Sequence, residues 1–591
     1  MTTIATANQS TLAAHPSSVA PWWRLPARGW RRLSEPVDGR IVPGTMIVFT
    51  AAVIVGLAFT AFAFAQDWLL LYLDAQSHLV IARRILDSQN PGLFQLGTAW
   101  LPAPHVLLLP LVAIFPLYSS GLAGALLGTL CLGVSAGALW RLTSRVGLHR
   151  DARLVVIVIF VLNPTTLFLS TTALTEPVLI AALLAAMAGL AGWITAMPAI
   201  SPGELAVFAG IPSTIAVLSR YEGWAFVALA SAFIALAAWR RWRSVRYTLT
   251  LVGAYLAAPL AGIVWWFGYN FSRTGNPLDF LVGEYSAGFE TARYAALGLI
   301  PTDGNLGLSI TIMTWAASNI IGPGFLIMAA VGGGILLWSR GLTTTALLLW
   351  MPGFIYAFQL MSLFLGQTYI ENPASLPADS FTNNRYAYGL LLLVAVLCGV
   401  LVDFVRTRWR VYGVALGAVI MAGSVAFLFW NVSAADERMV MVQEGNFEAT
   451  PPEAIVAADW LREHYRGGKI LLDDDPQGVL LRLGLPLSEV TNVFNGEIFL
   501  DAIKDPGANA EWIFANMINE ESPVWKTVSR DPDFDAQFVT VFESGTYRVF
   551  QNIGNEPIEG EEPIGDPLEF GQSPAPGSPA TGAVGQSGSQ P

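Results

Sequence analysis

The sequence predicts an α-helical polytopic membrane protein with a small α/β domain near its C-terminus. The chain has 591 residues, of which 54% are hydrophobic and only 13% are charged, whereas a soluble domain carries about 25% charged residues. Long apolar runs recur up to residue 430. Charge is also divided unevenly, with 16 acidic and 23 basic residues before residue 431 and 27 acidic and 9 basic residues after it. These observations separate a membrane part from an acidic, water-exposed part.

About eleven membrane-spanning helices are expected in the first part. A helix needs about 20 apolar residues to cross a bilayer. The basic segment 1–44 is too long for an ordinary signal peptide, and no small-residue cleavage site follows the first apolar run, so that run is expected to be an uncleaved span. The expected spans are 45–66, 119–139, 154–171, 174–196, 203–219, 223–239, 247–269, 323–338, 343–365, 386–404 and 411–430.

The arginine distribution sets the expected orientation and decides how often the stretch 104–139 crosses. Basic residues concentrate in cytoplasmic loops. With one crossing, 17 of the 23 arginines before residue 431 lie inside, whereas a second crossing would move 12 of those 17 outside. We therefore expect one crossing, with 104–118 as a helix against the outer leaflet. The protein would then lie in the cell membrane and consist of a cytoplasmic tail (1–44), a transmembrane domain (45–430) with an outward loop at 67–118, and an extracytoplasmic domain (431–556).

The C-terminal part shows mixed periodicity. Helical spacing covers 453–466, an apolar strand ends at Asp473-Asp474-Asp475, and 536–551 resembles a hairpin. The aspartate triplet fits a strand-end turn, with a site for a cation or a basic acceptor as the alternative. Residues 557–591 are rich in Pro, Gly and Ser and are expected to be disordered.

Composition argues against several functions. Cys131 and Cys398 both lie in apolar runs, which excludes a disulfide scaffold and disfavours a cysteine-based zinc site. The sequence contains no GxxxxGK loop for nucleotide phosphates. Basic residues form short clusters between apolar segments, which argues against nucleic-acid binding.

The segment after the first span contains the strongest candidate for chemistry. Asp74 lies where the chain leaves the bilayer, next to an apolar run, and a carboxylate in such a place favours function. His78 is four residues later and shares its helix face. Arg83 and Asp87 are explained by an ion pair on an amphipathic helix that ends near Pro91-Gly92. Trp100 and His105 flank two prolines that can direct them into a cavity, although an interfacial Trp before a helix start explains them equally well.

Other charged residues recur at the outward ends of later spans. Glu176 begins one span, and Arg220 and Glu222 occupy a turn, where they could also simply neutralise each other. Arg385 begins another span, and its fork of donors suits a phosphate group, with snorkelling to the interface as the alternative. Convergence of these residues on one cavity is a hypothesis.

These motifs resemble the GT-C superfamily of polyprenyl-phosphate-dependent glycosyltransferases. The similarity includes dolichyl-phosphate-mannose–protein mannosyltransferases and bacterial aminoarabinose transferases. The matching features are, in chain order, Asp74 after the first span, Ala82-Arg83, Trp100-Leu-Pro-Ala-Pro104, Leu174-Thr-Glu-Pro177 and Arg385-Tyr386. The chain departs from the commoner Asp-Glu pair of that group, because Ala75 follows Asp74.

The resemblance implies a membrane glycosyltransferase that moves a sugar, mannose or another hexose or pentose, from a polyprenyl-phosphate donor to an extracytoplasmic hydroxyl. Protein, glycolipid and cell-wall glycan are the candidate acceptors. Asp74 would be the general base of an inverting transfer, and Arg385, with Arg220 second, would bind the departing phosphate. Glu176 and His78 would orient the acceptor or Asp74, or hold a divalent cation, the one candidate cofactor. Cavity positions are assigned to Trp100, His105, Tyr221, Glu222 and Tyr386.

Two other functions are compatible with the composition. A transporter or lipid flippase for a cell-envelope precursor would also need many spans, but such proteins commonly contain repeated halves, and none is evident here. A non-catalytic membrane anchor would need only one span. Release of sugar from a lipid carrier in detergent would distinguish the enzyme from the transporter.

Overall fold

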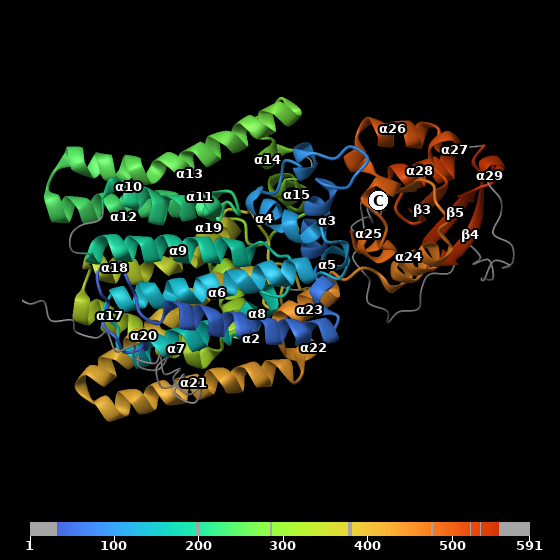
Figure 1. Ribbon diagram of the computed structural model, residues 1–591. Helices are drawn as coiled ribbons and strands as arrows, with labels where there is room; N and C mark the ends of the chain where they lie inside the picture. The colour runs from blue at the N-terminus through green and yellow to red at the C-terminus, as the bar shows by residue number, and fades with distance from the viewer. Residues whose placement is uncertain are drawn as a thin grey trace, which may run out of the picture.

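The computed structural model describes residues 32–196, 201–283, 286–375, 381–473, 477–520, 522–531 and 533–554. Figure 1 shows a bundle of long helices and, at one end of it, a smaller domain containing a sheet. We call this end of the bundle the domain end. Most of the N-terminal tail, the expected disordered segment 557–591, and Asp474 and Asp475 of the aspartate triplet lie outside the described residues.

Nine helical segments within the described residues are long and apolar enough to cross a membrane. This finding confirms the predicted class, a helical multi-pass membrane protein with a small C-terminal sheet. The nine are α2 (Thr45–Ala65), α6 (Leu122–Arg145), α9 (Glu176–Thr195), α12 (Glu222–Trp242), α13 (Val245–Thr274), α17 (Pro323–Arg340), Thr344–Phe364 with α18 (Thr344–Trp350) and α19 (Phe354–Phe364), Asn384–Arg408 with η6 (Asn384–Gly389) and α20 (Leu390–Arg408), and α21 (Arg410–Val432).

The expected span 154–171 is broken into two short helices. They are α7 (Arg150–Val161) and α8 (Pro164–Leu169). Pro164 has no N–H for the helix ladder, and Asn163 Oδ1 instead accepts hydrogen bonds from Thr165 N and Thr166 N at 3.0 and 3.2 Å. The side chain thus caps a new helix at the break.

The expected span 203–219 is also shorter than predicted. It consists of α10 (Pro202–Leu205), a π-helical turn (Ala206–Gly210) and α11 (Ile211–Val217). At 1.5 Å per residue its 16 residues cover about 24 Å, less than the roughly 30 Å of a bilayer core. The expected number of about eleven therefore becomes nine long spans, one broken segment and one short segment.

The stretch 104–139 contains one helix of crossing length, α6. Before it come α4 (Ala103–Val112) and α5 (Phe115–Ser119). Ten residues of α4 extend about 15 Å, half of a bilayer core. The length of α4 thus agrees with the single crossing that the arginine distribution favoured.

Small residues of α6 allow close approach by the segment that leads to Glu176. A Cβ on Gly128 would collide with the backbone of Ser170, and one on Gly124 would lie 2.6 Å from Ala173 N. Glycine at these positions lets two backbones touch, as is common between membrane helices. This packing fixes the start of α9, the next long helix of the chain.

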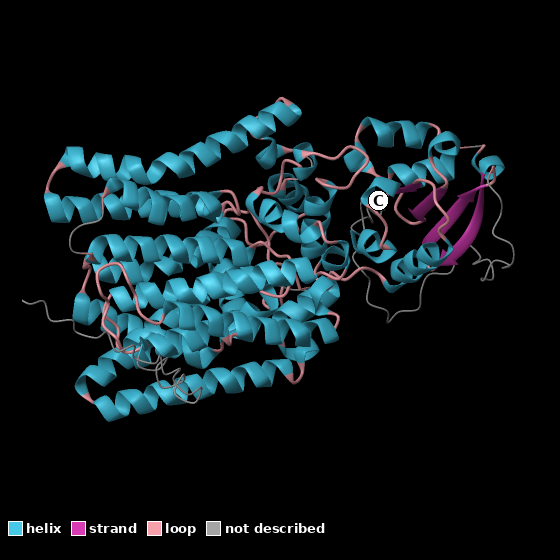
Figure 2. Cartoon of the chain, viewed as in Figure 1, coloured by secondary structure: helices cyan, strands magenta, loops and turns pink. Residues whose placement is uncertain are grey.

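The C-terminal domain is built on a five-stranded mixed sheet with strand order β2-β1-β3-β5-β4. The strands are β1 (Ile470–Leu472), β2 (Val490–Thr491), β3 (Trp512–Asn516), β4 (Phe538–Ser544) and β5 (Tyr547–Asn552). β1 is parallel to β2 and β3, whereas β5 is antiparallel to β3 and β4. Helices surround the sheet in Figure 2: α24 (Pro452–His464), α25 (Gln477–Leu483), α26 (Glu497–Lys504), α27 (Pro506–Asn509), α28 (Pro523–Arg530) and α29 (Phe534–Gln537). The helix, strand and hairpin expected at 453–466, 469–472 and 536–551 are confirmed.

The helix α3 (Leu73–Arg84) lies between the bundle and this domain. It ends before the expected Pro91-Gly92, because the chain turns back and Gly92 N donates to the Ile85 carbonyl at 3.0 Å. Arg83 and Asp87 form the predicted ion pair at 2.7 Å. Both faces of α3 are buried, so it is not a helix exposed on the membrane surface.

Polar contacts connect the segment after α3 to the C-terminal domain. Gln89 Nε2 donates to the Val490 carbonyl at 2.8 Å. The Arg84 guanidinium lies 3.8 Å from the centre of the Phe494 ring, and its Nε donates to the Gln95 carbonyl at 2.6 Å. The C-terminal domain therefore helps to fix the helix on which Asp74 lies.

We expect Arg84→Ala to lower the free energy of unfolding by about 2 kcal/mol, because it removes a buried charged donor and a cation–π contact. Thermal unfolding of the purified protein in detergent measures the change. The control is Arg466→Ala, at an exposed arginine that contacts only nearby backbone carbonyls, which should change stability by less than about 0.5 kcal/mol. Equal melting temperatures for the two variants would contradict the anchoring role of Arg84.

Candidate active site

Asp74 lies in the first turn of α3, where the helix dipole favours a negative charge. Tyr72 precedes the helix in an extended conformation. Gln76 Nε2 donates to the Leu70 carbonyl at 2.6 Å, which ties the start of the helix to the chain leaving α2. The Asp74 side chain is 33% exposed. It is therefore a fixed carboxylate that remains accessible.

Arg385 brings together groups that are far apart in the sequence. Asn383, in the left-handed region with φ of 61°, turns the chain into η6, where Arg385 is buried. The guanidinium Nε donates to Glu176 Oε1 at 3.1 Å, Nη2 contacts Asp74, and Nη1 contacts the Tyr72 hydroxyl. The structure thus places Asp74, Glu176 and Arg385 in one cluster, as the sequence hypothesis required.

Arg220 extends the same cluster. Its Nη1 donates to Glu176 Oε1 and Thr175 Oγ1, both at 3.0 Å. Its Nε donates to Glu222 Oε1 at 3.0 Å, and Gln359 Nε2 donates to the same oxygen at 2.7 Å. Glu176, at the first position of α9, therefore bridges two arginines. Arg220 and Glu222 do neutralise each other, but within the cluster rather than in a separate surface turn.

The two tyrosines assigned to the cavity lie in different places. The Tyr386 ring centre is 5.7 Å from the Arg220 guanidinium carbon and 5.4 Å from that of Arg385, so it belongs to the cluster. Tyr221 stacks on Phe280 at 5.4 Å and donates from its hydroxyl to the Ala99 carbonyl at 2.9 Å. Tyr221 therefore supports the loop before Trp100 instead of contacting the carboxylates.

The two histidines form a buried pair beside the cluster. His78 Nδ1 lies 2.9 Å from His105 Nε2, and His105 Nδ1 lies 3.1 Å from the Leu101 carbonyl oxygen. The ring of Trp100, 38% exposed, has its centre 4.5 Å from that of His78. Burial lowers the pKa of His78 to about 3 and that of His105 well below its ordinary value. Burial therefore favours the neutral form of both imidazoles.

Sequence reasoning missed two carboxylates that follow the last span. Glu444, fully buried in α23 (Val440–Phe447), contacts the Tyr72 hydroxyl, accepts from Asn384 N at 3.2 Å, and lies 3.7 Å from Arg385 Nη1. Glu448 follows one helical turn later. A carboxylate two residues after the apolar run Met439-Val440-Met441-Val442 was the available signal, but this run lay in the segment assigned to the acidic domain.

Burial shifts both of these added carboxyl groups toward the neutral form. Burial raises the pKa of Glu444, and burial together with the charge of Asp74 raises the pKa of Glu448. Burial also raises the pKa of the Tyr72 hydroxyl well above its usual range. The positive charge of Arg385 opposes this shift in both groups.

The donor set does not favour a metal ion. No group of three or more His, Cys, Asp or Glu side chains within the described ranges is arranged to hold one. Both strong ligand candidates already have partners, since Glu176 bridges two arginines and His78 pairs with His105. The cluster is therefore built around guanidinium groups.

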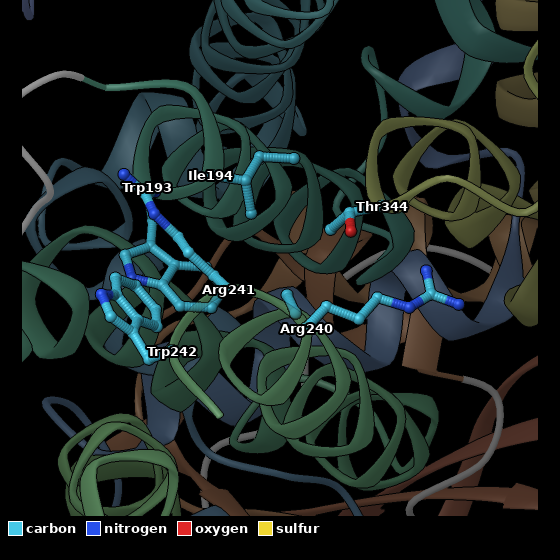
Figure 3. Close-up of a pocket in the computed structure, with 7 residues that line it drawn as sticks. Trp193, Ile194, Arg240, Arg241, Trp242 and Thr344 are labelled. Atoms are coloured by element: carbon cyan, nitrogen blue, oxygen red, sulfur yellow. The ribbon is translucent and has the colours of Figure 1, made fainter. Parts of the chain in front are cut away.

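A cavity of about 260 Å³ lies at the opposite end of the bundle. Figure 3 draws the residues that line it. Trp193 near the end of α9 and Trp242 at the end of α12 line it, whereas Glu176 and Glu222 begin those helices. Its two arginines, Arg240 and Arg241, extend in different directions (Figure 3). This cavity is therefore separate from the carboxylate cluster.

The arrangement supports acid–base and phosphate chemistry at the domain end. Asp74 is the accessible carboxylate, and the buried Arg385 presents three nitrogen donors beside it. A carboxylate can take a proton from a hydroxyl group, and a guanidinium in a water-poor setting stabilises negative charge on a phosphate.

Comparisons with solved structures identify the fold. ArnT from Cupriavidus metallidurans in complex with undecaprenyl phosphate aligns with a TM-score of 0.52 and 14% sequence identity, over 85% of this chain and 98% of ArnT. Its apo form gives a TM-score of 0.50 and 15% identity over the same shares. The oligosaccharyltransferase AglB from Archaeoglobus fulgidus aligns with a TM-score of 0.46 and 12% identity, over 87% of this chain and 75% of AglB. No protein-family model and no curated protein sequence matches this chain significantly. The chain therefore shares the membrane fold of ArnT, one of the proteins that the sequence resemblance includes.

Proposed function

We propose that this protein is a membrane glycosyltransferase that transfers a sugar from a polyprenyl-phosphate donor to an acceptor hydroxyl, with inversion at the anomeric carbon. The observation that carries the proposal is the convergence of Asp74, Glu176 and Arg385 at the domain end of a GT-C fold. ArnT, which has this fold, binds undecaprenyl phosphate. A hexose such as mannose or a pentose is the proposed sugar, and a protein, a glycolipid or a cell-wall glycan is the acceptor.

Asp74 is the proposed general base. The acceptor oxygen attacks the anomeric carbon and forms the new glycosidic bond, while the bond between that carbon and the phosphate oxygen breaks. The hydroxyl proton passes to Asp74, and polyprenyl phosphate leaves with the bonding electrons. Asp74 suits this role because it is the most exposed carboxylate among the partners of Arg385, with 33% exposure against 8% for Glu176 and none for Glu444.

Arg385 is the proposed phosphate ligand, and the arrival of the donor frees the base. In the structure Arg385 Nη2 contacts Asp74 Oδ2, so the guanidinium occupies one of the two oxygens of this carboxylate. A donor phosphate near Nη2 would compete for the guanidinium and release Asp74 for the acceptor hydroxyl. Glu176 would keep Arg385 oriented through Nε, and Arg220 would add positive charge nearby.

We further propose that the domain end faces the outside of the cell. This orientation follows the excess of arginine at the opposite end and places both the acceptor and the C-terminal domain outside. Labelling of single cysteines introduced at exposed positions of the C-terminal domain, with a reagent that does not cross membranes, tests it in intact cells.

The test of the function is an assay with purified protein in detergent. Undecaprenyl-phosphate-linked mannose and glucose, labelled in the sugar, are supplied with and without membrane extracts as acceptor. Protein-dependent loss of sugar from the lipid supports the transferase. Movement of intact labelled lipid across liposomes, with no bond cleavage in either assay, would instead identify a flippase.

A further inference from the structure

The hydrogen bonds of the histidine pair fix which ring nitrogens carry protons. A carbonyl oxygen only accepts hydrogen bonds, so His105 Nδ1, 3.1 Å from the Leu101 oxygen, must carry the hydrogen. A neutral imidazole has one N–H. His105 Nε2 is therefore an acceptor, and His78 Nδ1, 2.9 Å from it, must be the donor. His78 Nε2 is consequently left with a lone pair and no proton.

This lone pair has no partner from the protein. No described residue donates a hydrogen bond to His78 Nε2. The nearest cations are already engaged, since Arg385 donates to Glu176, Tyr72 and Asp74, and Arg220 donates to Glu176, Thr175 and Glu222. Because Nε2 is not a fully buried atom, this bare acceptor at the edge of a candidate active site is open to a donor group of a ligand.

The surroundings of His78 indicate what kind of ligand supplies that donor. Trp100 contacts the His78 ring and keeps an exposed aromatic surface. Its loop is fixed on both sides, because Tyr221 donates to the Ala99 carbonyl at 2.9 Å and Ala103 N donates to the Leu218 carbonyl at 2.8 Å. An aromatic surface beside one oriented acceptor suits a sugar ring, which offers C–H groups to the first and a hydroxyl to the second.

We propose that His78 Nε2 accepts a hydrogen bond from a hydroxyl group of the transferred sugar while the sugar ring lies against Trp100. The proposal rests on the proposed transferase function and specifies a contact within it. His78 is then a binding residue with a defined polarity, and His105 is a positioning residue that fixes its tautomer. A sugar with a carboxylate at this position is disfavoured, since two acceptors would face each other.

Two substitutions separate the two nitrogens of His78. The amide nitrogen of Asn can replace Nδ1 and keep the bond to His105, but Asn has no atom at the place of Nε2. The longer Gln can place an amide oxygen near Nε2 and keep an acceptor there. Binding of labelled undecaprenyl-phosphate mannose and glucose, and of their monodeoxy analogues, is measured on immobilised wild type, His78→Asn and His78→Gln.

We expect the wild type and His78→Gln to bind the full sugar about tenfold more tightly than one monodeoxy analogue, the size of a single hydrogen bond. His78→Asn should lose this discrimination for that analogue. Equal discrimination by His78→Asn for every analogue would overturn the contact. If neither sugar-linked lipid binds to the wild type, the proposed His78 contact and the proposed donor class are both wrong. If a lipid binds but its sugar is not transferred, only the proposed enzyme function is wrong.

Nitrogen NMR tests the tautomer independently of activity. The chain has five histidines, so histidine-specific ¹⁵N labelling gives few signals, and the His78 variants assign the relevant pair. We expect protonated Nδ1 and bare Nε2 for both residues between pH 5 and 8. The groups facing His78 are Glu176, Arg220 and Arg385, with His105 and then Arg84 beyond it. A proton on His78 Nε2 would overturn the proposal.

Discussion

Replacement of Asp74 by Asn should lower the rate of sugar transfer by a factor of about 10² to 10⁴ and leave the fold intact. Asn keeps an oxygen that can accept from Arg385 but cannot take a proton from the acceptor, and loss of a general base has an effect of this size. Because the Asp74 side chain is 33% exposed, stability should change little. Single-turnover transfer of labelled sugar gives the rate, and thermal unfolding in detergent gives the stability.

The matched control for this variant is Glu204→Gln. It also changes a carboxylate to an amide, but its partners are Arg40, at 2.5 Å, and Ser201, and it lies outside the cluster. Its transfer rate should remain within about twofold of the wild type, corresponding to less than 0.5 kcal/mol. A fully active Asp74→Asn variant would remove Asp74 from the mechanism.

Arg385→Ala should be severely destabilising, with a loss of about 3–5 kcal/mol in the free energy of unfolding. Removal of one partner from a buried ionic network leaves uncompensated charge, and Glu176 and Glu444 are both buried around Arg385. A role in phosphate binding alone would predict mainly a loss of donor affinity. The burial of Arg385, 5% exposed, predicts instead that little folded protein would be recovered.

A double variant tests this explanation. Glu444→Gln removes one carboxyl group that would be stranded, so the pair Arg385→Ala/Glu444→Gln should recover part of the lost stability, as a double-mutant cycle reports. Arg385→Lys keeps a positive charge but cannot reach all partners of the guanidinium fork, and it is the better variant for measuring donor binding. Unfolding temperatures of Arg385→Ala, Glu444→Gln and the double variant are compared with that of the wild type, and an Arg385→Ala protein as stable as the wild type contradicts the network.

Much of the fold was readable from local pattern. Apolar run length predicted the nine long spans found within the described residues, and arginine placement favoured a single crossing at 104–139, with which the ten residues of α4 agree. The hydropathy pattern does not show the break at Asn163-Pro164, because the apolar run continues through it. Hydropathy is an average over a window of residues and does not register a single proline. A helix can nevertheless break at one proline, which lacks a backbone N–H, when the side chain before it caps a new helix.

The sequence indicated only some of the residues that form the candidate site. Asp74, Glu176 and Arg385 stood out because charge is rare at span ends. Glu444 lay among other acidic residues after the last span, so charge gave no contrast there. In the sequence Tyr72 is one of many aromatic residues near a span and gives no distinct signal. In the structure its hydroxyl contacts both Arg385 and Glu444. Partners so distant in the chain are set by tertiary packing, which no local pattern encodes.

The position of Glu444 after the last span has a consequence for biosynthesis. Arg385 acquires its full set of partners only when the ribosome has translated past α23 and that short helix has folded back against the first loop of the chain. Until then the nascent bundle carries a buried cation that is only partly neutralised. A chain terminated at residue 433 would contain all nine long spans of the described residues and still lack Glu444, so insertion of these spans and completion of the cluster are separable steps.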